Sequence, residues 1–499
     1  MLLASKETTA KTKKYMSFKE ILAYSLGLFG FQAIVGLLNS YQAEFDASIL
    51  GADIAVVGIL ILVAKLLSAV FDPIIGSRID RSKSKRGKFK SMILYSLVPL
   101  LVMTAVVFID VPFKSHRLAT YIWIFVTYLL WSLAMTMGDV PSQGIASVLT
   151  PDPTERTNVV SISNTAKQIG FAACAVIVPI ACLIIPGGSQ VFGYEGETDT
   201  PMIGTEYFWT AVLTAVFGVV LFALIPMLNK ERVPYQAGEK TTLKDMVRIL
   251  KDNKPLMLVI VSYFLGFGRQ MAMGIQVQAA NVILGSQNLV AVLGVVTAVG
   301  SMLSMVLTPF LIKKMGEKKV YLLLSIYGFV ASALSFVVGF FWFRNPSNIV
   351  LTILFYFFLF AIGLQFAAVT LMPMIMTADC VDYYEYTTGK RQEGGAYAIL
   401  TLTIKVCLAL GTALGLVFVQ VSGYSDTVRE IAAGTTSGFS VHTKDLVFFA
   451  YTFVPGLLAL LSTIPMFKYD LSGKKKADIA AALQERRAEA QKPAAETAE

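Results

Sequence analysis

The chain has 499 residues, of which 55% are hydrophobic and only 15% are charged. This composition leaves too little polar surface to cover a water-soluble fold, so it excludes a soluble enzyme or binding domain and indicates a membrane protein. The formal net charge of +9 does not indicate nucleic-acid binding, because the basic residues fall in alternate loops, which is the pattern of membrane topology.

Apolar stretches of about 20 residues, the length that crosses a bilayer as a helix, recur along nearly the whole chain. They predict an all-α membrane protein with twelve transmembrane helices. The expected spans are 20–45, 53–77, 91–111, 119–148, 158–185, 206–228, 256–284, 289–312, 320–342, 349–375, 395–422 and 447–468. With the basic loops on the cytoplasmic side, both termini are expected inside the cell. The first twenty residues have no apolar core and do not resemble a signal peptide.

A polar, basic segment separates the first six expected helices from the last six. The predicted organisation is an N-terminal half (1–228), a cytoplasmic linker (229–255), a C-terminal half (256–470) and a charged cytoplasmic tail (471–499). The second helix of each half ends in a proline followed by a basic run, at 73–90 and at 309–319. Such repetition is typical of transporters of the major facilitator type, although positive-inside bias alone also supplies basic loops.

Ionisable side chains inside a spanning helix are energetically costly, so they are candidates for functional sites. Lys65, Ser68 and Asp72 follow each other at steps of three and four and share a helix face, so we expect Lys65 to pair with Asp72. Other polar residues predicted within the helices are Gln32, Thr136, Asp139, Gln143, Asn164, Lys167, Gln168, Arg269, Gln270, Thr401 and Lys405. Interhelical hydrogen bonds and structural ion pairs are the alternative roles for such residues.

The histidines and cysteines of the chain do not predict a functional site. His116 and His442 fall in predicted outer loops, so coupling to protons would have to use carboxylates. The four cysteines lie in predicted helices or on the cytoplasmic side, and no disulfide, metal site or cofactor is expected. The motif GxxxxGK[ST] does not occur, which disfavours transport driven by ATP.

Two segments carry a resemblance to a known family. Residues 71–90, FDPIIGSRIDRSKSKRGKFK, resemble the glycoside-pentoside-hexuronide:cation symporters in the order Asp-Pro, Gly, Asp-Arg and Gly-Lys-Phe. Residues 378–394, ADCVDYYEYTTGKRQEG, resemble the loop between helices 10 and 11 of the same family, and Lys405 follows at the family's spacing. The resemblance implies the major facilitator fold, with two six-helix halves and a substrate site between them.

The loops of these segments carry candidates for a gate. Asp379, Asp382 and Glu385 lie three residues apart and would share a helix face, where they would pair with Arg156 or with loop lysines. Salt bridges that break during alternating access would then control opening, whereas solvated surface charges are the alternative. The complete set of gate candidates is Asp80, Arg81, Arg156, Asp379, Asp382 and Glu385.

The resemblance also implies a cation site, built in the family from two acids and an amide on helix 2 and a threonine on helix 4. This chain keeps Asp72 and Thr136 but has Ser68 and Phe71 at the other two positions. A hard cation requires several oxygen ligands, so the loss of a carboxylate and an amide weakens a sodium site more than it weakens proton transfer by Asp72. We therefore expect the co-transported cation to be a proton rather than sodium.

The family's sugar-binding positions have changed as well. They correspond here to Gln32, Asp139, Gln143, Asn164, Thr370, Thr401 and Lys405, with Lys167 as an alternative to Asn164. Only Asp139, Thr401 and Lys405 keep the family's residue. Four basic residues within the predicted helices, at 65, 167, 269 and 405, exceed the acids Asp72 and Asp139 by two charges. This surplus favours an acidic substrate, such as a uronide or a sulfonated sugar.

These observations predict a secondary active transporter that imports a sugar, glycoside or related solute by cation-coupled symport. The alternatives are an uncoupled facilitator or exchanger of an organic anion, or a transporter-like sensor. A membrane enzyme with Asp139 and Lys405 as acid and base is disfavoured, because no nucleophile or metal-ligand cluster accompanies them. The expected partners are a small-molecule substrate and membrane lipids, with no nucleic acid. We expect a monomer in the bacterial inner membrane.

Overall fold

The computed structural model describes residues 15–485, apart from residues 81, 83, 85, 151–152, 185–203, 233–242, 286–289, 390–391, 433–434, 437, 480 and 484. The described residues form helices joined by turns, and they contain no strand. The helices of the N-terminal half are α1 (Phe18–Ser48), α2 (Ile54–Asp80), α3 (Lys88–Val107), α4 (Arg117–Gly144), α5 (Ala146–Leu149), α6 (Pro153–Ile184) and α7 (Gly204–Leu228).

The second half begins after the linker helix α8 (Leu243–Asp252). Its helices are α9 (Lys254–Leu265), α10 (Gly268–Gly274), α11 (Gln276–Leu284), α12 (Val290–Met315), α13 (Glu317–Trp342), α14 (Ile349–Leu364), α15 (Phe366–Thr388), α16 (Glu393–Val421), α17 (Tyr424–Ala432), α18 (Val441–Phe448), the π-helix η2 (Phe449–Phe453), α19 (Val454–Leu461) and α20 (Thr463–Phe467).

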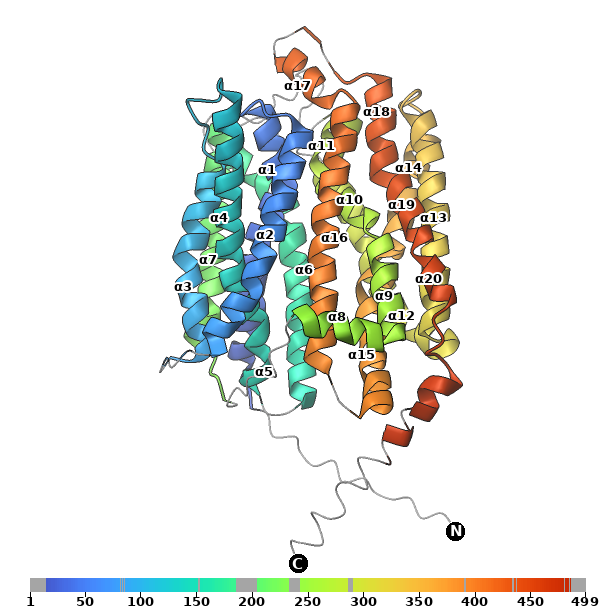
Figure 1. The fold of residues 1–499 in the computed structure, drawn as a ribbon. Coiled ribbons are helices and arrows are strands. Elements are labelled where there is room, and N and C mark those ends of the chain that lie inside the picture. Colours follow the sequence, from blue (N-terminus) through green and yellow to red (C-terminus); the bar gives the residue numbers. More distant parts are fainter. Residues whose placement is uncertain are drawn as a thin grey trace, which may run out of the picture.

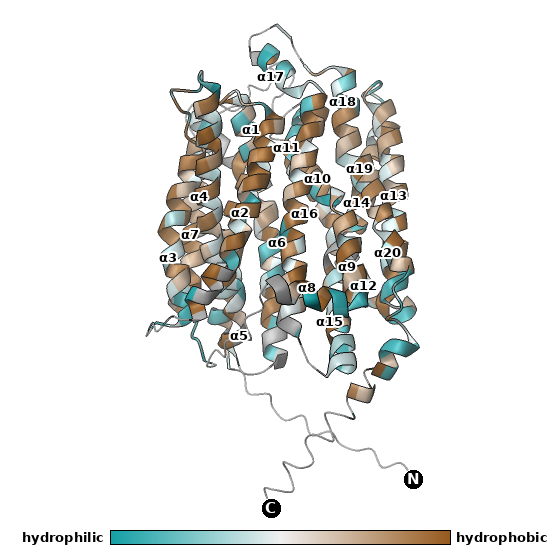
Figure 2. Ribbon diagram, in the orientation of Figure 1, coloured by the Kyte–Doolittle hydropathy of each residue, from teal (hydrophilic) through white to brown (hydrophobic). Residues whose placement is uncertain are grey.

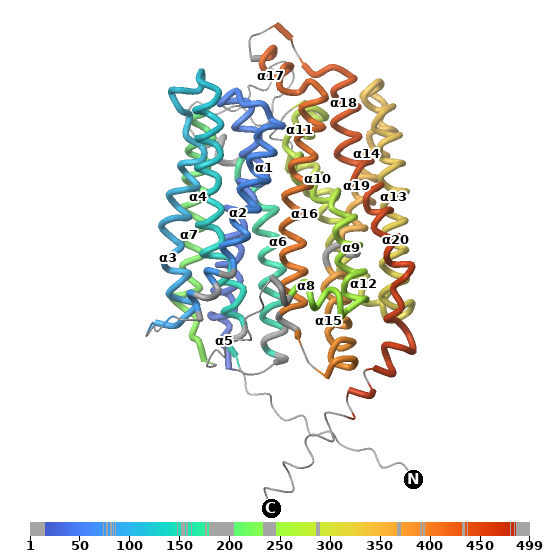
Figure 3. Tube along the Cα trace, viewed as in Figure 1, coloured from blue at the N-terminus to red at the C-terminus, as the bar shows by residue number. Residues whose placement is uncertain are grey.

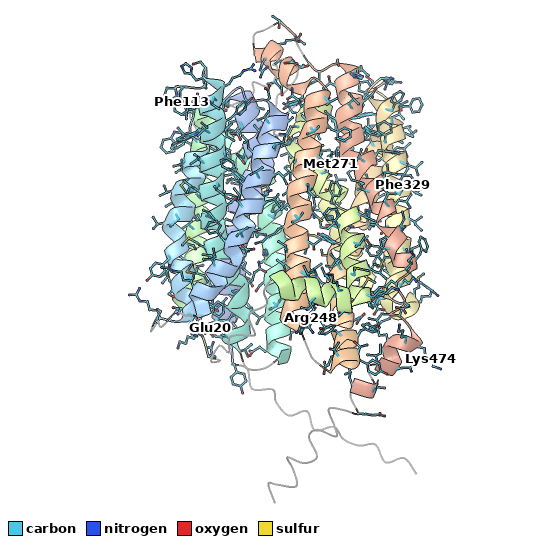
Figure 4. All side chains as sticks on the ribbon, viewed as in Figure 1. Glu20, Phe113, Arg248, Met271, Phe329 and Lys474 are labelled. Carbon is cyan, nitrogen blue, oxygen red and sulfur yellow. The ribbon has the colours of Figure 1, made fainter. Side chains whose placement is uncertain are left out.

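The long helices run side by side in one bundle, and the described chain begins and ends at the same end of it (Figure 1). We call this end the terminal end, and the end covered by α17 the far end. Figure 4 places Glu20, Arg248 and Lys474 at the terminal end and Phe113 at the far end. Because the described chain begins and ends at the same end of the bundle, its path agrees with an even number of membrane crossings.

The outside of the bundle is apolar, as expected for helices that face lipid. Brown, hydrophobic residues dominate the length of the helices in Figure 2, and hydrophilic residues gather at the two ends. Val70, Val306 and Phe310 expose 64%, 63% and 67% of their surface. Ten segments of the described chain are long and apolar enough to cross a membrane, so the count of twelve spans stays a prediction.

Four expected spans are interrupted, which the sequence does not indicate. The span 119–148 is divided between α4 and α5 at Ile145, and the span 349–375 is divided between α14 and α15 at Gln365. The predicted helix 256–284 is divided into α9, α10 and α11, with breaks at Gly266–Phe267 and at Ile275, and its irregular path is visible in Figure 3. The predicted helix 447–468 is divided into α18, η2, α19 and α20, and Pro455 lies in the first turn of α19. Proline has no amide hydrogen to donate, so the wider turn before it accommodates the lost hydrogen bond.

Close helix packing builds the N-terminal half and joins it to the C-terminal half. In the N-terminal half, α1 lies against α7 at Gly30 and Gly218, where a Cβ on Gly30 would come within 2.6 Å of the Gly218 carbonyl oxygen. Between the halves, α2 packs along α16. A Cβ on Gly58 of α2 would meet Ala413 Cα of α16 at 3.3 Å. The contact between these two helices positions the side chains described next.

Candidate functional site

An ion pair between spanning helices joins the two halves. Lys405 of α16 donates a hydrogen bond to Oδ2 of Asp72 on α2, with side chains that are 29% and 25% exposed. The predicted pairing of Asp72 with Lys65 is wrong, because Lys65 Nζ instead donates to Oδ1 of Asn39 on α1 over 3.0 Å. Helical side chains lean toward the N-terminus, so Lys65 points away from a residue two turns later.

Asp72 keeps one oxygen free for a further partner. Its Oδ1 atom is buried and has no hydrogen-bond partner among the described residues. Two residues of α4 lie beside the Asp72 carboxylate: Thr136 interacts with it as a side-chain hydrogen-bond partner, and Asp139 acts on it as a second negative charge. Ser68 does not contribute a ligand, because its hydroxyl donates to the backbone oxygen of Lys65 over 2.9 Å. Asp72 therefore contacts Lys405 and has Thr136 beside it, whereas Ser68 is not among its ligands.

A second cluster surrounds Asp139, which is 8% exposed. Lys167 Nζ of α6 lies 3.7 Å from Asp139 Oδ1, and Gln143 Nε2 of α4 donates to Oδ2 over 2.8 Å. The structure thus brings together three predicted substrate-binding positions: Asp139 and Gln143, which share a face of α4, and Lys167 of α6. The second acid of the spanning helices also has a basic partner, in this case within the N-terminal half.

Several polar side chains near these two clusters are exposed rather than buried. Gln143, Asn164, Gln168 and Thr401 are exposed on α4, α6 and α16. Polar side chains of spanning helices normally face a water-filled cavity instead of lipid. This placement indicates an aqueous opening beside Asp139 and Lys405. Gln32 is half-buried on α1, and the side chain of Thr370 lies outside the described residues.

The predicted gate residues are only partly described. Asp379 of α15 pairs with Lys476 of the tail over 2.7 Å, and Lys476 also contacts Glu317 over 2.7 Å. The expected partners of Asp379, Arg156 or loop lysines, are therefore replaced by a tail residue to which the sequence analysis gave no role. Asp382 and Glu385 are half-buried on the same helix. Arg81 and the side chains of Asp80 and Arg156 lie outside the described residues.

A polar contact that the sequence does not indicate joins the two halves at the far end. Glu44 of α1 is 1% exposed and accepts hydrogen bonds from the Tyr424 hydroxyl over 2.7 Å and from Gln278 Nε2 over 3.1 Å. Asn281 Nδ2 donates to the same tyrosine oxygen over 2.9 Å. We call Glu44, Gln278 and Tyr424 the Glu44 seal. Glu44 lies at the end of the expected span 20–45, where an acidic residue would ordinarily face the membrane surface, so the sequence does not indicate its burial.

A surface contact extends this closure. Arg429 of α17 lies 3.4 Å from Asp53 and donates to the backbone oxygen of Gly51 over 3.1 Å. The side chain of Gln420 on α16 accepts a hydrogen bond from the backbone amide of Ile54 over 3.2 Å. Together with the Glu44 seal, these contacts close the far end of the bundle between its two halves.

Comparison with known proteins identifies the family. Residues 23–473 match the family model described as MFS/sugar transport protein. The chain is 27% identical to the uncharacterized symporter YjmB of Bacillus subtilis, over 85% of this chain and 87% of that protein. It is 25% identical to the glucuronide carrier protein homolog of Escherichia coli (95% and 96% covered) and 27% identical to the isoprimeverose transporter of Lactiplantibacillus pentosus (83% and 82% covered).

A solved structure shows the same fold. The bacterial homolog of the human lysosomal transporter Spinster, in an inward-facing and unoccupied conformation, matches with a TM-score of 0.62 at 14% identity, over 92% of this chain and 99% of that one. These matches confirm the resemblance to the glycoside-pentoside-hexuronide:cation symporters and the interpretation as a transporter rather than an enzyme. The chain therefore belongs to the MFS/sugar transport protein family, as a multi-pass membrane transporter of the major facilitator type.

Proposed function

We propose that this protein imports a sugar, glycoside or related solute across the bacterial cytoplasmic membrane by cation-coupled symport with alternating access, and that its terminal end is cytoplasmic. The contact between Asp72 and Lys405 carries the proposal. It is an ion pair in the interior of a membrane transporter, and it links helices from opposite halves. A group that binds a cation there acts directly on the contact between the halves.

The coupling step follows from this geometry. When Asp72 is ionised, it attracts Lys405 and holds α2 against α16. When Asp72 accepts a proton, the attraction is lost, and the halves are free to rearrange around the site. A proton suits this carboxylate better than sodium, because Ser68 is directed to the backbone and a hard cation requires several oxygen ligands.

The Asp139 cluster and the exposed polar residues beside it support the binding of the solute. Asp139, Gln143 and Lys167 offer an acceptor, an amide and a donor within one group, which suits the hydroxyls of a sugar. Two relatives are named for different solutes: one for a glucuronide, which is acidic, and the other for isoprimeverose, which is neutral. We take methyl β-D-glucuronide as the first probe, because the basic residues in the spanning helices exceed Asp72 and Asp139.

The experiment measures uptake of methyl β-D-glucuronide and methyl β-D-glucoside into proteoliposomes under an imposed proton gradient, an imposed sodium gradient, or neither. Symport with protons predicts accumulation above the external concentration only with the proton gradient. Equal equilibration under all three conditions would contradict coupling. Asp72→Asn serves as the coupling-deficient variant, and Asp426→Asn, an exposed residue of α17 at the far end, serves as the matched control.

Uncoupled exchange of an organic anion is the second candidate. It is favoured by the ammonium group of Lys405, which already neutralises Asp72 and removes the need for a co-transported cation. The two functions differ in counterflow. An exchanger accelerates uptake when the same solute is loaded inside and shows no response to an imposed gradient, whereas a symporter responds to the gradient in the absence of internal solute.

A further inference from the structure

The acid of the Glu44 seal is buried without a basic partner. Glu44 is 1% exposed, and its two hydrogen-bond donors, the Tyr424 hydroxyl and Gln278 Nε2, are neutral groups. No other side chain of the described residues interacts with its carboxyl. A carboxylate that loses its water and gains no positive charge is strongly destabilised, whereas a protonated carboxyl is buried at a much lower cost. The closed far end therefore favours an acid that carries a proton.

The basic residues on the helices around α1 are engaged elsewhere. Arg429 of α17 pairs with Asp53, and Lys65 and Lys167 have the acceptors described above. Arg269 of α10 lies over a tyrosine ring, with its guanidinium carbon 5.6 Å from the ring centroid. The other described basic residues of α1 and the helices packed against it are Lys19, Arg78, Lys88, Lys90 and Arg117. None of these cations is among the groups that interact with the carboxyl of the seal.

The acids and phenols near the seal add no positive charge. Glu206 and Tyr207 lie near the start of α7, and Tyr207 acts on the Tyr424 hydroxyl. Asp46 of α1 accepts a hydrogen bond from a glutamine of the same helix and acts on Tyr128 of α4. The residues that α11 contributes to the seal are amides. These groups are neutral or acidic, so none of them neutralises an ionised Glu44.

Glu44 differs in this respect from the acids of the coupling and binding clusters. Asp72 contacts Lys405, and Asp139 lies 3.7 Å from the ammonium group of Lys167. An ammonium group at such a distance stabilises the ionised form of a carboxyl. Glu44 joins the two halves through hydrogen bonds alone, and its charge state is therefore set by its exposure to water.

The seal accommodates a protonated acid without losing a contact. Gln278 Oε1 is buried and has no hydrogen-bond partner among the described residues, while Nε2 of the same amide donates to Glu44 Oε2 over 3.1 Å. Rotation of an amide by half a turn exchanges its donor and its acceptor. Gln278 Oε1 then accepts a hydrogen bond from the protonated Glu44, and the Tyr424 hydroxyl keeps its bond to the other carboxyl oxygen.

Opening of the far end reverses the surroundings of Glu44. The acid belongs to α1 of the N-terminal half, whereas Gln278 of α11 and Tyr424 of α17 belong to the C-terminal half. Separation of the halves removes both donors and admits water, which stabilises the ionised carboxylate. A proton that binds the closed conformation better than the open one shifts the balance toward closure.

We propose that Glu44 is a proton-binding site of the far end, which holds a proton while the two halves are closed there and releases it when they separate. The site is separate from Asp72, because its proton comes from, and returns to, the side of the membrane that the far end faces. With the terminal end in the cytoplasm, acid outside the cell promotes closure of the far end. This inference goes beyond the proposed function and requires alternating access but no particular coupling ion.

The test follows the far end as a function of pH by distances between spin labels at positions 116 and 442, which are exposed on the two halves. The labels are attached through His116→Cys and His442→Cys after the native cysteines have been replaced. The labelled protein then contains no histidine, so imidazole does not contribute to a response near neutral pH. Every sample also carries Asp72→Asn, which removes the titration of the coupling acid.

The open fraction of this parent protein should rise with pH. One linked proton changes the ratio of open to closed molecules by up to about tenfold for each pH unit. Glu44→Gln stays neutral at every pH and should abolish the response. Asp46→Asn is the matched control and should retain it, because Asp46 is equally buried but bonded within the N-terminal half. A response that survives in Glu44→Gln, or that is absent from the parent, would overturn the inference.

Infrared spectroscopy detects the proton independently of the conformational balance. At a pH at which the far end is closed, the spectrum of the parent minus that of Glu44→Gln should contain the C=O band of a protonated carboxyl. Carboxylate bands in its place would overturn the inference even if the distances changed with pH. Uptake experiments separate this site from symport. Failure of every gradient to drive uptake, with the pH response of the far end intact, would refute symport but not the role of Glu44.

Discussion

The Glu44 seal gives the sharpest test of how the two halves close at the far end. Glu44 accepts hydrogen bonds from Tyr424 and Gln278, which both belong to the C-terminal half, and it is 1% exposed. In a conformation open at the far end, water replaces both bonds. Glu44→Ala therefore removes two contacts that exist only in the closed conformation and leaves two buried donors without their acceptor.

The size of the effect follows from the number of bonds. Each hydrogen bond contributes about 1 kcal/mol if Glu44 is neutral and about 2 kcal/mol if it is ionised, so the closed conformation loses about 2–4 kcal/mol. Because 1.4 kcal/mol is a factor of ten, the ratio of open to closed molecules should rise roughly 30-fold to 700-fold. Glu44→Gln keeps an acceptor and should shift the ratio much less.

The chain provides a matched control on the same helix. Asp46 is also 1% exposed, but its carboxylate accepts a hydrogen bond from Gln42 Nε2 of α1 over 2.8 Å, within the N-terminal half. Asp46→Ala thus removes an equally buried acid without removing a contact between the halves. It should destabilise folding but leave the balance between open and closed conformations nearly unchanged.

The assay measures distances between spin labels at positions 116 and 442, which are exposed at the far end of the two halves. Both histidines are replaced by cysteine in a background without the four native cysteines. Glu44→Ala should increase the fraction of long distances, and Asp46→Ala should not. An unchanged distance distribution for Glu44→Ala, or equal changes for both variants, would refute the assignment of Glu44 as the seal.

Three further predictions concern the ion pairs. Asp72→Asn should reduce gradient-driven accumulation about tenfold or more while changing solute affinity far less, as measured by uptake and calorimetry; normal accumulation would exclude Asp72 from coupling. Asp139→Asn and Lys405→Ala should each weaken solute binding about tenfold, because both alter charged groups beside the aqueous opening, and unchanged affinity would place the solute elsewhere. Lys476→Ala should lower the free energy of unfolding by about 1 kcal/mol in thermal unfolding, because it leaves Glu317 and Asp379 without their basic partner. Lys475→Ala removes a single surface ion pair with Asp470 and should have a smaller effect. Burial alone would lower the pKa of Lys476, but its hydrogen bonds to Asp379 and Glu317 outweigh burial and raise the pKa above 10.5. The stabilisation by Lys476 should therefore persist through neutral pH and be lost only as the pH rises through the raised pKa of the folded protein.

The sequence alone determined the class of protein and much of the candidate set. Long apolar stretches must become helices in a bilayer, because backbone polar groups have no water to bind there. Ionisable residues within those stretches are costly for the same reason, so the sequence alone indicates Asp72, Asp139, Lys167, Arg269 and Lys405 as candidates.

Only the tertiary structure decided the partners of these residues. Helical periodicity places Lys65 and Asp72 on one face. Because α16 packs along α2, however, Asp72 pairs with Lys405, and Lys65 forms a hydrogen bond with Asn39 instead. The burial of Arg269 and of Glu44 likewise depends on helices far away in the chain. Periodicity is a local property of one helix, whereas pairing and burial depend on how different helices meet.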